Sequence, residues 1–278
     1  MRSFVRSILF SLLAACSVAG ELSFTVTAER GGEEVDASDL NIVRIPSRQH
    51  SRQGPATNED EKRNTISYSG NWCGASQHAA NASDQIVNAF GSFTAPDLTL
   101  RPGLPAPQFA AAWVGIDGAS CKSTLLQAGV TTVINSNGGQ SASAWWEWFP
   151  DAAFKISGLT IKPGDWMSVN ITTSSLTTAK VVITNASRGV VVTINISNGS
   201  KLCRADVEWI LEDFYDIEGQ VAFAKFSDVW FLDTSATTAR GKHIGIDGAA
   251  MVYLQSTSGA VTCMAEQYDD SSFVVYSP

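Results

Sequence analysis

Cys203-Arg204-Ala205-Asp206-Val207-Glu208-Trp209-Ile210-Leu211-Glu212-Asp213-Phe214 is the stretch that decides the fold, because its apolar residues alternate. In a β-strand, successive side chains point to opposite faces of the sheet. The core face would carry Val207, Trp209 and Leu211, and the opposite face would carry Glu208, Ile210, Glu212 and Phe214. Carboxylates on that second face indicate either a solvated acidic edge or a functional cleft, and this stretch alone favours the solvated edge.

The composition is that of an acidic globular protein. The chain has 278 residues, of which 44% are hydrophobic and 17% charged, so it can bury a sizeable core. Its net charge of −8 argues against nucleic acid as a partner, because nucleic-acid binders carry basic patches. An acidic chain also suits work at low pH, where protonation relieves self-repulsion.

The N-terminus is typical of a secretory signal peptide over residues 1–20. Two arginines precede an apolar run, Ile8 to Ala15, that is too short to span a bilayer. The sequence Leu13-Ala14-Ala15-Cys16 also matches a bacterial lipidation box, an alternative that the glycosylation sequons disfavour. These sequons begin at Asn81, Asn170, Asn185, Asn195 and Asn198. We therefore expect a secreted, extracellular glycoprotein that has no membrane span.

Residues 21–68 form a charged leader that differs from the rest of the chain. Acidic residues come first, and residues 41–58 then contain Arg44, Arg48, His50 and Arg52 without any acid. Such a segment is either a disordered tail or a pro-segment whose arginines dock on an acidic site. In the second case acid would weaken the docking by protonating the carboxylates.

The remaining residues, 69–278, predict an all-β domain. Strand-like runs recur between turn signals, and residues 180–184 and 190–196 flank a hairpin turn. No window of a dozen residues has a helical period. This texture predicts an antiparallel two-sheet β-sandwich of the concanavalin A-like or jelly-roll type.

Several common kinds of site lack support in this sequence. Of three histidines, His50 lies in the leader, and His78 and His243 lie in polar contexts, so a Ser-His-Asp or Cys-His site is poorly supported. No metal-binding spacing or phosphate-binding loop is apparent, and no cofactor or metal is expected. The sequence Asp233-Thr234-Ser235 continues with alanine, where an aspartic peptidase motif requires glycine.

Five blocks, in order, resemble the glutamic peptidases, or eqolisins, of fungi. The blocks are Asn71-Trp72-Cys73-Gly74, Trp113 to Gly118, Leu125 to Gly129, Trp145 to Trp148, and Cys203 to Phe214. The resemblance implies a β-sandwich peptidase made as a precursor, with a catalytic dyad that falls on Gln127 and Glu212. It identifies Trp113, Asp117 and Glu147 as supporting residues close to the dyad. Without the family, Trp113 would be a core or rim residue, Asp117 a turn cap and Glu147 a strand-edge charge.

The resemblance also bears on the cysteines. Once Cys16 leaves with the signal peptide, four cysteines remain, and two disulfides in a secreted protein could form in three pairings. The family disulfide falls on Cys121 and Cys203, which would leave Cys73 to pair with Cys263. The sequence departs from the family at Ser143 and Thr131, where relatives often carry acids. The loss of two acids near the cleft would raise the pH optimum or alter subsite preference, and it leaves the dyad intact.

The expected function is a secreted acid endopeptidase that acts on protein or peptide substrates as a monomer, with its own pro-segment as an intramolecular inhibitor. Two alternatives remain. Eight tryptophans would suit a carbohydrate-active or lectin-like sandwich, in which Glu147 and Glu212 could serve as a glycosidase pair. A non-catalytic binding protein on the same scaffold is the other, because a fold does not fix a function.

Overall fold

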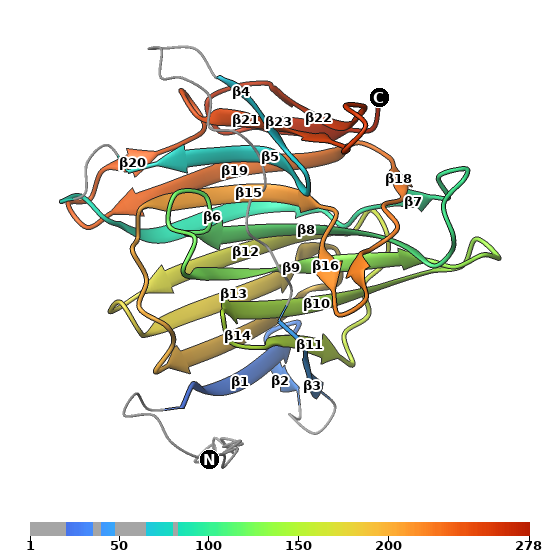
Figure 1. Cartoon of the computed structure of the whole chain (residues 1–278). Coiled ribbons are helices and arrows are strands. Elements are labelled where there is room, and N and C mark those ends of the chain that lie inside the picture. The colour runs from blue at the N-terminus through green and yellow to red at the C-terminus, as the bar shows by residue number, and fades with distance from the viewer. Residues whose placement is uncertain (1–20, 36–39, 48–64, 80–82) are drawn as a thin grey trace.

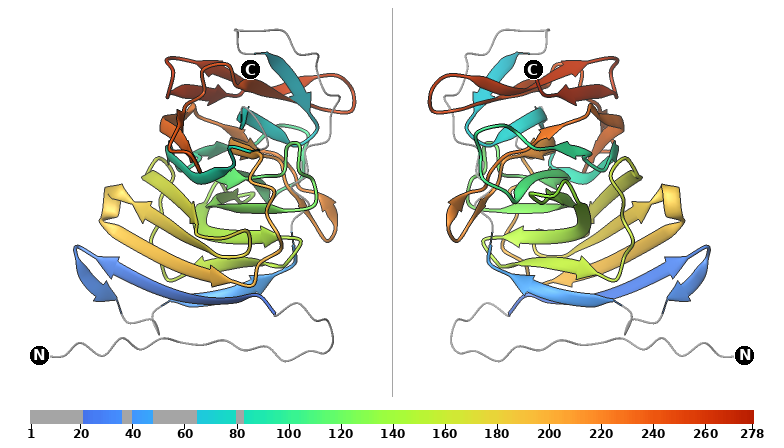
Figure 2. Two further views of the ribbon diagram at one scale, coloured as in Figure 1. Left: turned by 90° about the vertical axis from the view of Figure 1, so that its left-hand side faces the viewer. Right: turned by 90° about the vertical axis from the view of Figure 1, so that its right-hand side faces the viewer.

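The structure is a computed structural model that describes residues 21–35, 40–47, 65–79 and 83–278. The predicted signal peptide, together with Arg48, His50, Arg52 and Asn81, lies outside these residues. Two curved β-layers are stacked face to face, as the side views in Figure 2 show. The expectation of an all-β chain is confirmed, because the only helical turn in the described part is the 3-10 helix η2 (Ala186–Arg188). No helix among the described residues is long and apolar enough to cross a membrane.

The first layer, sheet A, is antiparallel throughout (Figure 1). In spatial order it contains β2 (Glu33–Val35), β1 (Ser23–Arg30), β14 (Val190–Ser197), β13 (Ala179–Asn185), β12 (Trp166–Thr173), β6 (Ile86–Thr94), β19 (Val229–Thr238), β23 (Phe273–Tyr276) and β22 (Val261–Gln267), with β20 (His243–Ile244) beside β19. The hairpin expected around residues 180–196 is confirmed by the pairing of β13 with β14.

The second layer, sheet B, carries the residues of the five family-like blocks. In spatial order it contains β3 (Asn41–Ile45), β11 (Ala153–Ser157), β10 (Gln140–Phe149), β9 (Leu125–Ile134), β8 (Gln108–Ile116), β15 (Asp206–Glu212), β5 (Trp72–His78), β21 (Ala250–Gln255) and β4 (Ile66–Ser69). Among the described residues of this sheet, the pairing of β21 with β4 is parallel and the other strand pairs are antiparallel. Because β22 also pairs with β21, the two layers are joined at this end.

Two short ribbons lie outside the layers. They pair β16 (Tyr215–Asp216) with β17 (Gly219–Gln220), and β7 (Leu98–Thr99) with β18 (Lys225–Phe226).

The main core lies between the layers and receives the inner face of β15. Val207, Trp209 and Leu211 all belong to it, as the alternation predicts. A second, smaller apolar cluster lies on the other face of sheet B and contains Ile210 and Phe214. The face that carries Glu208 and Glu212 is therefore a partly apolar, buried surface and not a solvated edge.

The leader is built into both layers, which the disordered-tail alternative did not predict. Strand β1 pairs with β14 over eight residues and with the outer strand β2, and β3 pairs with β11 over five residues. The leader therefore extends sheet A by two strands and sheet B by the edge strand β3. The ring of Phe24 packs edge-on against Trp146 and Phe154, with centroid distances of 5.0 and 4.7 Å. These leader strands lie at one end of the sandwich and the C-terminal strands lie at the other (Figure 1).

The sequons differ in their accessibility. Asn185 is buried and its amide donates to Asp165 (2.9 Å), so this side chain is poorly placed to accept a glycan. Asn195 and Asn198 are exposed, although Asn195 lies within β14.

Close contact between β8 and β9 requires a glycine at position 129. A Cβ atom built on Gly129 would lie 2.1 Å from the carbonyl oxygen of Ala112 and 2.6 Å from the Cβ of Trp113. Backbone atoms cannot move aside without separating the strands, so overpacking here is costly.

We expect Gly129→Ala to lower the free energy of unfolding by about 3 kcal/mol, the upper end of the usual cost of overpacking. Urea denaturation followed by tryptophan fluorescence measures this change. Gly139→Ala is the matched control, because Gly139 is exposed and its new methyl group would meet only the side chain of Asn137. Equal stability of the two variants would contradict this account of Gly129.

Candidate active site

Three cross-strand rows on the outer face of sheet B bring the candidate residues together. The first row joins Glu147, Gln127, Gly115 and Glu208 across β10, β9, β8 and β15. The second joins Trp145, Gly129, Trp113 and Ile210, and the third joins Ser143, Thr131, Ala111, Glu212 and Trp72. Gln127 and Glu212 therefore share a face, with the aromatic second row between them.

Glu212 is fully buried and is held by three N–H groups. Its Oε1 accepts from the Nδ2 of Asn71 (3.1 Å) and the Nε1 of Trp72 (3.0 Å), and its Oε2 accepts from the Nε1 of Trp113 (2.9 Å). A buried carboxylate without such donors would be very costly, so these contacts both permit and orient it. Sequence reasoning missed the roles of Asn71 and Trp72, although their block was part of the family resemblance.

Gln127 is also fully buried, and only one end of its amide has a partner. Its Nε2 donates to the Oε2 of Glu147 (3.0 Å), whereas its Oε1 is buried without a hydrogen bond. Buried polar atoms in native proteins are usually paired, so an acceptor of this kind calls for an explanation. It is suitably placed to accept a hydrogen bond from a ligand or a water molecule.

Trp113 links the first row to the third. Its indole nitrogen contacts Glu212, while the edge of its six-membered ring lies 2.9 Å from where a Cβ atom would stand on Gly115. The same position is 3.4 Å from the Cβ of Gln127, so the ring reaches the neighbourhood of Gln127 only because residue 115 is glycine. Trp72 packs edge-on against Trp113 at a centroid distance of 5.1 Å and fixes its orientation.

The two departures from the family pattern lie in the row of Glu212. Thr131 pairs with both Ser143 and Ala111, and Ala111 pairs with Glu212. Ser143 and Thr131 therefore place hydroxyl groups on the same face as Glu212.

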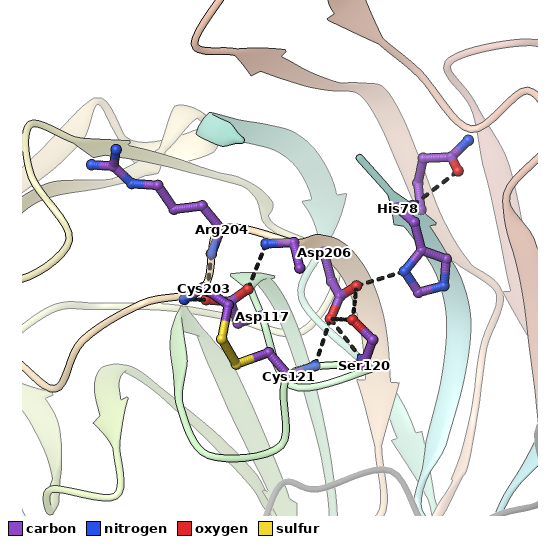
Figure 3. A network of polar contacts seen from close by, with 9 residues as sticks. His78, Asp117, Ser120, Cys121, Cys203, Arg204 and Asp206 are labelled. Carbon is purple, nitrogen blue, oxygen red and sulfur yellow. Dashed lines mark hydrogen bonds and ion pairs between the residues drawn. A yellow bond between two sulfur atoms is a disulfide. The ribbon is translucent and has the colours of Figure 1, made fainter. Parts of the chain in front are cut away.

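Asp117 lies outside this surface. It follows β8 with a φ of 72°, and its carboxylate accepts hydrogen bonds from the backbone N–H groups of Cys203, Arg204 and Ala205 at 2.8–3.0 Å. None of its described hydrogen bonds goes to Gln127 or Glu212; it fastens the turn after β8 to the chain that enters β15 (Figure 3). Burial raises the pKa of Asp117 to about 6, despite the opposing effect of these three donors.

The disulfide between Cys121 and Cys203 strengthens the same junction (Figure 3). Asp206, at the start of β15, accepts from the Nδ1 of His78 (2.5 Å) and from Ser120. The second disulfide joins Cys73 to Cys263, so both predicted pairings are confirmed. Asp117, Cys121 and Cys203 have the spacing of a metal site, but both sulfurs are used in the disulfide.

The leader reaches the candidate site through a hydroxyl group. The Oγ of Ser47 donates to the Oε1 of Glu147 (2.8 Å), the same carboxylate that holds Gln127. Arg44, one of the arginines expected to shield the site, lines a pocket together with Asp151 at the sheet edge. The other two, Arg48 and Arg52, lie outside the described residues.

Comparisons with known proteins agree on one family. Residues 70–277 match the Peptidase A4 family. The chain is 29% identical to aspergillopepsin-2 of Aspergillus niger, over 96% of each protein, and 32% identical to scytalidopepsin B of Scytalidium lignicola, over 54% of this chain and 60% of that protein.

Solved structures give the same answer. A crystal structure of scytalido-glutamic peptidase with a peptide-based transition-state analog superposes with a TM-score of 0.65 at 26% identity, covering 75% of this chain and 98% of that one. The crystal structure of aspergilloglutamic peptidase from Aspergillus niger gives 0.58 at 34% identity, covering 62% and 99%. These peptidases favour the expected sandwich and speak against the carbohydrate-binding alternative.

Asp213, next to Glu212, makes stability depend on pH. Burial, followed by the charge of Glu212, raises its pKa to about 8, while Arg101 opposes the shift. A carboxyl group whose pKa is raised by folding stabilises the protein fully below its unfolded pKa. This contribution is lost as the pH rises through the folded value.

We therefore expect the free energy of unfolding to fall by about 3 kcal/mol between pH 5 and pH 8, with much of this loss due to Asp213. Asp213→Asn should flatten the dependence, whereas Asp228→Asn, at an exposed position, should leave it unchanged. Urea denaturation at several pH values tests this. An equally steep pH dependence in Asp213→Asn would refute the assignment.

Proposed function

Because the chain belongs to the Peptidase A4 family, we propose that it is a secreted, acid-acting endopeptidase that uses Gln127 and Glu212 as its catalytic dyad. The observation that carries the proposal is that one side chain is fully held by hydrogen bonds while the other keeps a buried acceptor atom for a ligand. Glu212 is fixed by three donors, and Gln127 presents a buried acceptor that has no partner. Both belong to one face of sheet B, as joint action on one substrate requires.

The proposed reaction begins with a water molecule that both side chains contact. Glu212 as a carboxylate takes a proton from this water, which attacks the carbonyl carbon of the peptide bond. The Oε1 of Gln127 accepts a hydrogen bond from the water and orients it. The second N–H of the Gln127 amide donates to the oxyanion that develops on the carbonyl oxygen.

The tetrahedral intermediate then collapses as Glu212 returns the proton to the leaving nitrogen. A donor to an oxyanion typically lowers the barrier by about 3–4 kcal/mol, which is the contribution asked of Gln127. Glu147 acts as a positioning residue, because it holds one N–H of the amide and so fixes which atoms face the substrate. Trp113 positions Glu212 in the same way.

The register of sheet B sets one condition on this mechanism. Gln127 lies in the same row as Glu208, and Glu208 is four residues before Glu212 along β15. Gln127 also lies on β9, which β8 separates from β15. Both long side chains must therefore lean over the aromatic row around Trp113 for one water to contact them.

We expect Glu212→Gln to abolish hydrolysis of casein at acid pH, and Gln127→Ala to lower kcat by about 10²–10³-fold. Both variants should stay folded by circular dichroism. Glu218→Gln is the matched control, since it makes the same change at an exposed position. Full activity in either dyad variant would remove the assignment, and cleavage of polysaccharide instead of casein would favour the carbohydrate-active alternative.

The leader is proposed to be a pro-segment that keeps the precursor inactive. The contact of Ser47 with Glu147 supports this, because it occupies a carboxylate that touches the dyad. The strands β1 and β3 support it as well, since their backbone pairing anchors the leader on both sheets.

Acidification of the purified precursor should lead to self-cleavage between about His50 and Tyr68, detected by mass spectrometry of the intact chain. The Glu212→Gln precursor should stay uncut alone and be cut when active enzyme is added. A wild-type precursor that reaches full activity without any cut in this region would contradict the pro-segment assignment.

A further inference from the structure

The leader strand β3 extends the candidate catalytic sheet at its edge. Ile45 pairs with Ala153 of β11, which pairs with Glu147, which pairs with Gln127. Cross-strand partners point to the same face, so Ile45 stands in the row of Gln127. Strand β3 is therefore aligned with the candidate site and runs, from Asn41 to Ile45, toward the level of Gln127.

The chain leaves the edge of sheet B at Pro46. Pro46 follows the last paired residue, and a proline has no N–H with which to continue a ladder. One residue later, the Oγ of Ser47 contacts Glu147, which lies on β10, beyond β11. The segment thus passes from the edge of sheet B onto its outer face within two residues.

We infer that the edge of β11 (Ala153–Ser157), covered by β3 in the precursor, is the docking site in the mature enzyme for an extended segment of the substrate that lies on the amino-terminal side of the scissile bond. The segment would add to sheet B as an antiparallel strand and then cross onto the outer face, as residues 41–47 do. The inference rests on the proposed function, because it concerns the substrate of that peptidase.

The direction of β3 predicts which side of the scissile bond pairs with β11. The leader runs from the edge toward Glu147 and Gln127 in the amino-to-carboxyl direction. A substrate in its place would therefore present its paired residues before, and its scissile bond after, the position that corresponds to Ser47. A carboxyl-terminal extension of a substrate would not reach this edge in the same orientation.

Loss of the leader would leave the backbone groups of β11 unpaired on one side, and an open strand edge accepts another strand readily. The occupant seen there in this chain is an extended peptide whose next residues touch the candidate site. A second copy of the enzyme is the competing occupant, and it would bring no chain onto the outer face.

The expected gain in binding is moderate. The net gain from each backbone hydrogen bond is small, and the entropic cost of ordering each residue is of similar size. Burial of apolar side chains supplies the surplus, as Ile42 does by packing against the core. We therefore expect about a tenfold effect, expressed in KM and not in kcat, because the contact is the same in the ground and transition states.

The test uses acid-matured enzyme and a short fluorogenic peptide that it cleaves. One version carries Asn-Ile-Val-Arg-Ile-Pro-Ser, the sequence of residues 41–47, at its amino end, and a control carries the same residues at its carboxyl end. The amino-terminal extension should lower KM about tenfold, and the carboxyl-terminal extension should not. Along a paired edge strand, every second N–H points to the neighbouring strand and the others point away. N-methylation of the amides that face β11 should therefore cancel the gain in KM, and N-methylation of the amides in between should preserve it.

Equal effects of the two extensions, or insensitivity to both N-methylation patterns, would overturn the inference. An enzyme that is dimeric by sedimentation and indifferent to extension would assign the edge to a second copy, which also overturns it. Absence of any cleavage of the short peptide or of casein would instead count against the proposed function, so the two failures are distinguishable.

Discussion

The buried carboxylate of Glu212 is the constraint on which the arrangement depends. A carboxylate removed from water needs several donors, and here they come from the side chains of Asn71, Trp72 and Trp113. These donors belong to β5, its preceding turn and β8, the two strands that flank β15. The order of strands at the centre of sheet B is therefore tied to a single charged group, which the apolar outer cluster shields from solvent.

The junction before β15 keeps that strand in register. Asp117 and the disulfide between Cys121 and Cys203 attach the turn after β8 to the residues leading into β15. Asp206 adds contacts to Ser120 and His78, which lower its pKa although burial alone would raise it. A slip of one residue in β15 would turn Glu212 toward the core, so a rigid junction protects the orientation of the carboxylate.

The sequence predicts the parts of this structure that follow from local pattern or from family blocks. The alternation around Trp209 separates the two faces of β15. The resemblance implies the disulfide between Cys121 and Cys203, and elimination leaves Cys73 to pair with Cys263, as the structure has them. The donors Asn71 and Trp72 escape local reasoning because they lie about 140 residues from Glu212. The leader strands escape it because an edge strand needs only one apolar face, so Phe24 and Ile42 suffice in a charged segment.

Protonation alone does not account for release of the leader from the two sheets. Acid can weaken contacts that depend on carboxylates, but the backbone pairing of β1 and β3 and the packing of Phe24 do not titrate. A cut after Ser47 removes the covalent link between the leader and the catalytic domain. The leader strand, held until then at a high effective concentration, becomes a separate ligand that dilution can remove. On the proposal that the leader is a pro-segment, cleavage and not protonation frees the edge of β11, and acid acts by enabling the cleavage.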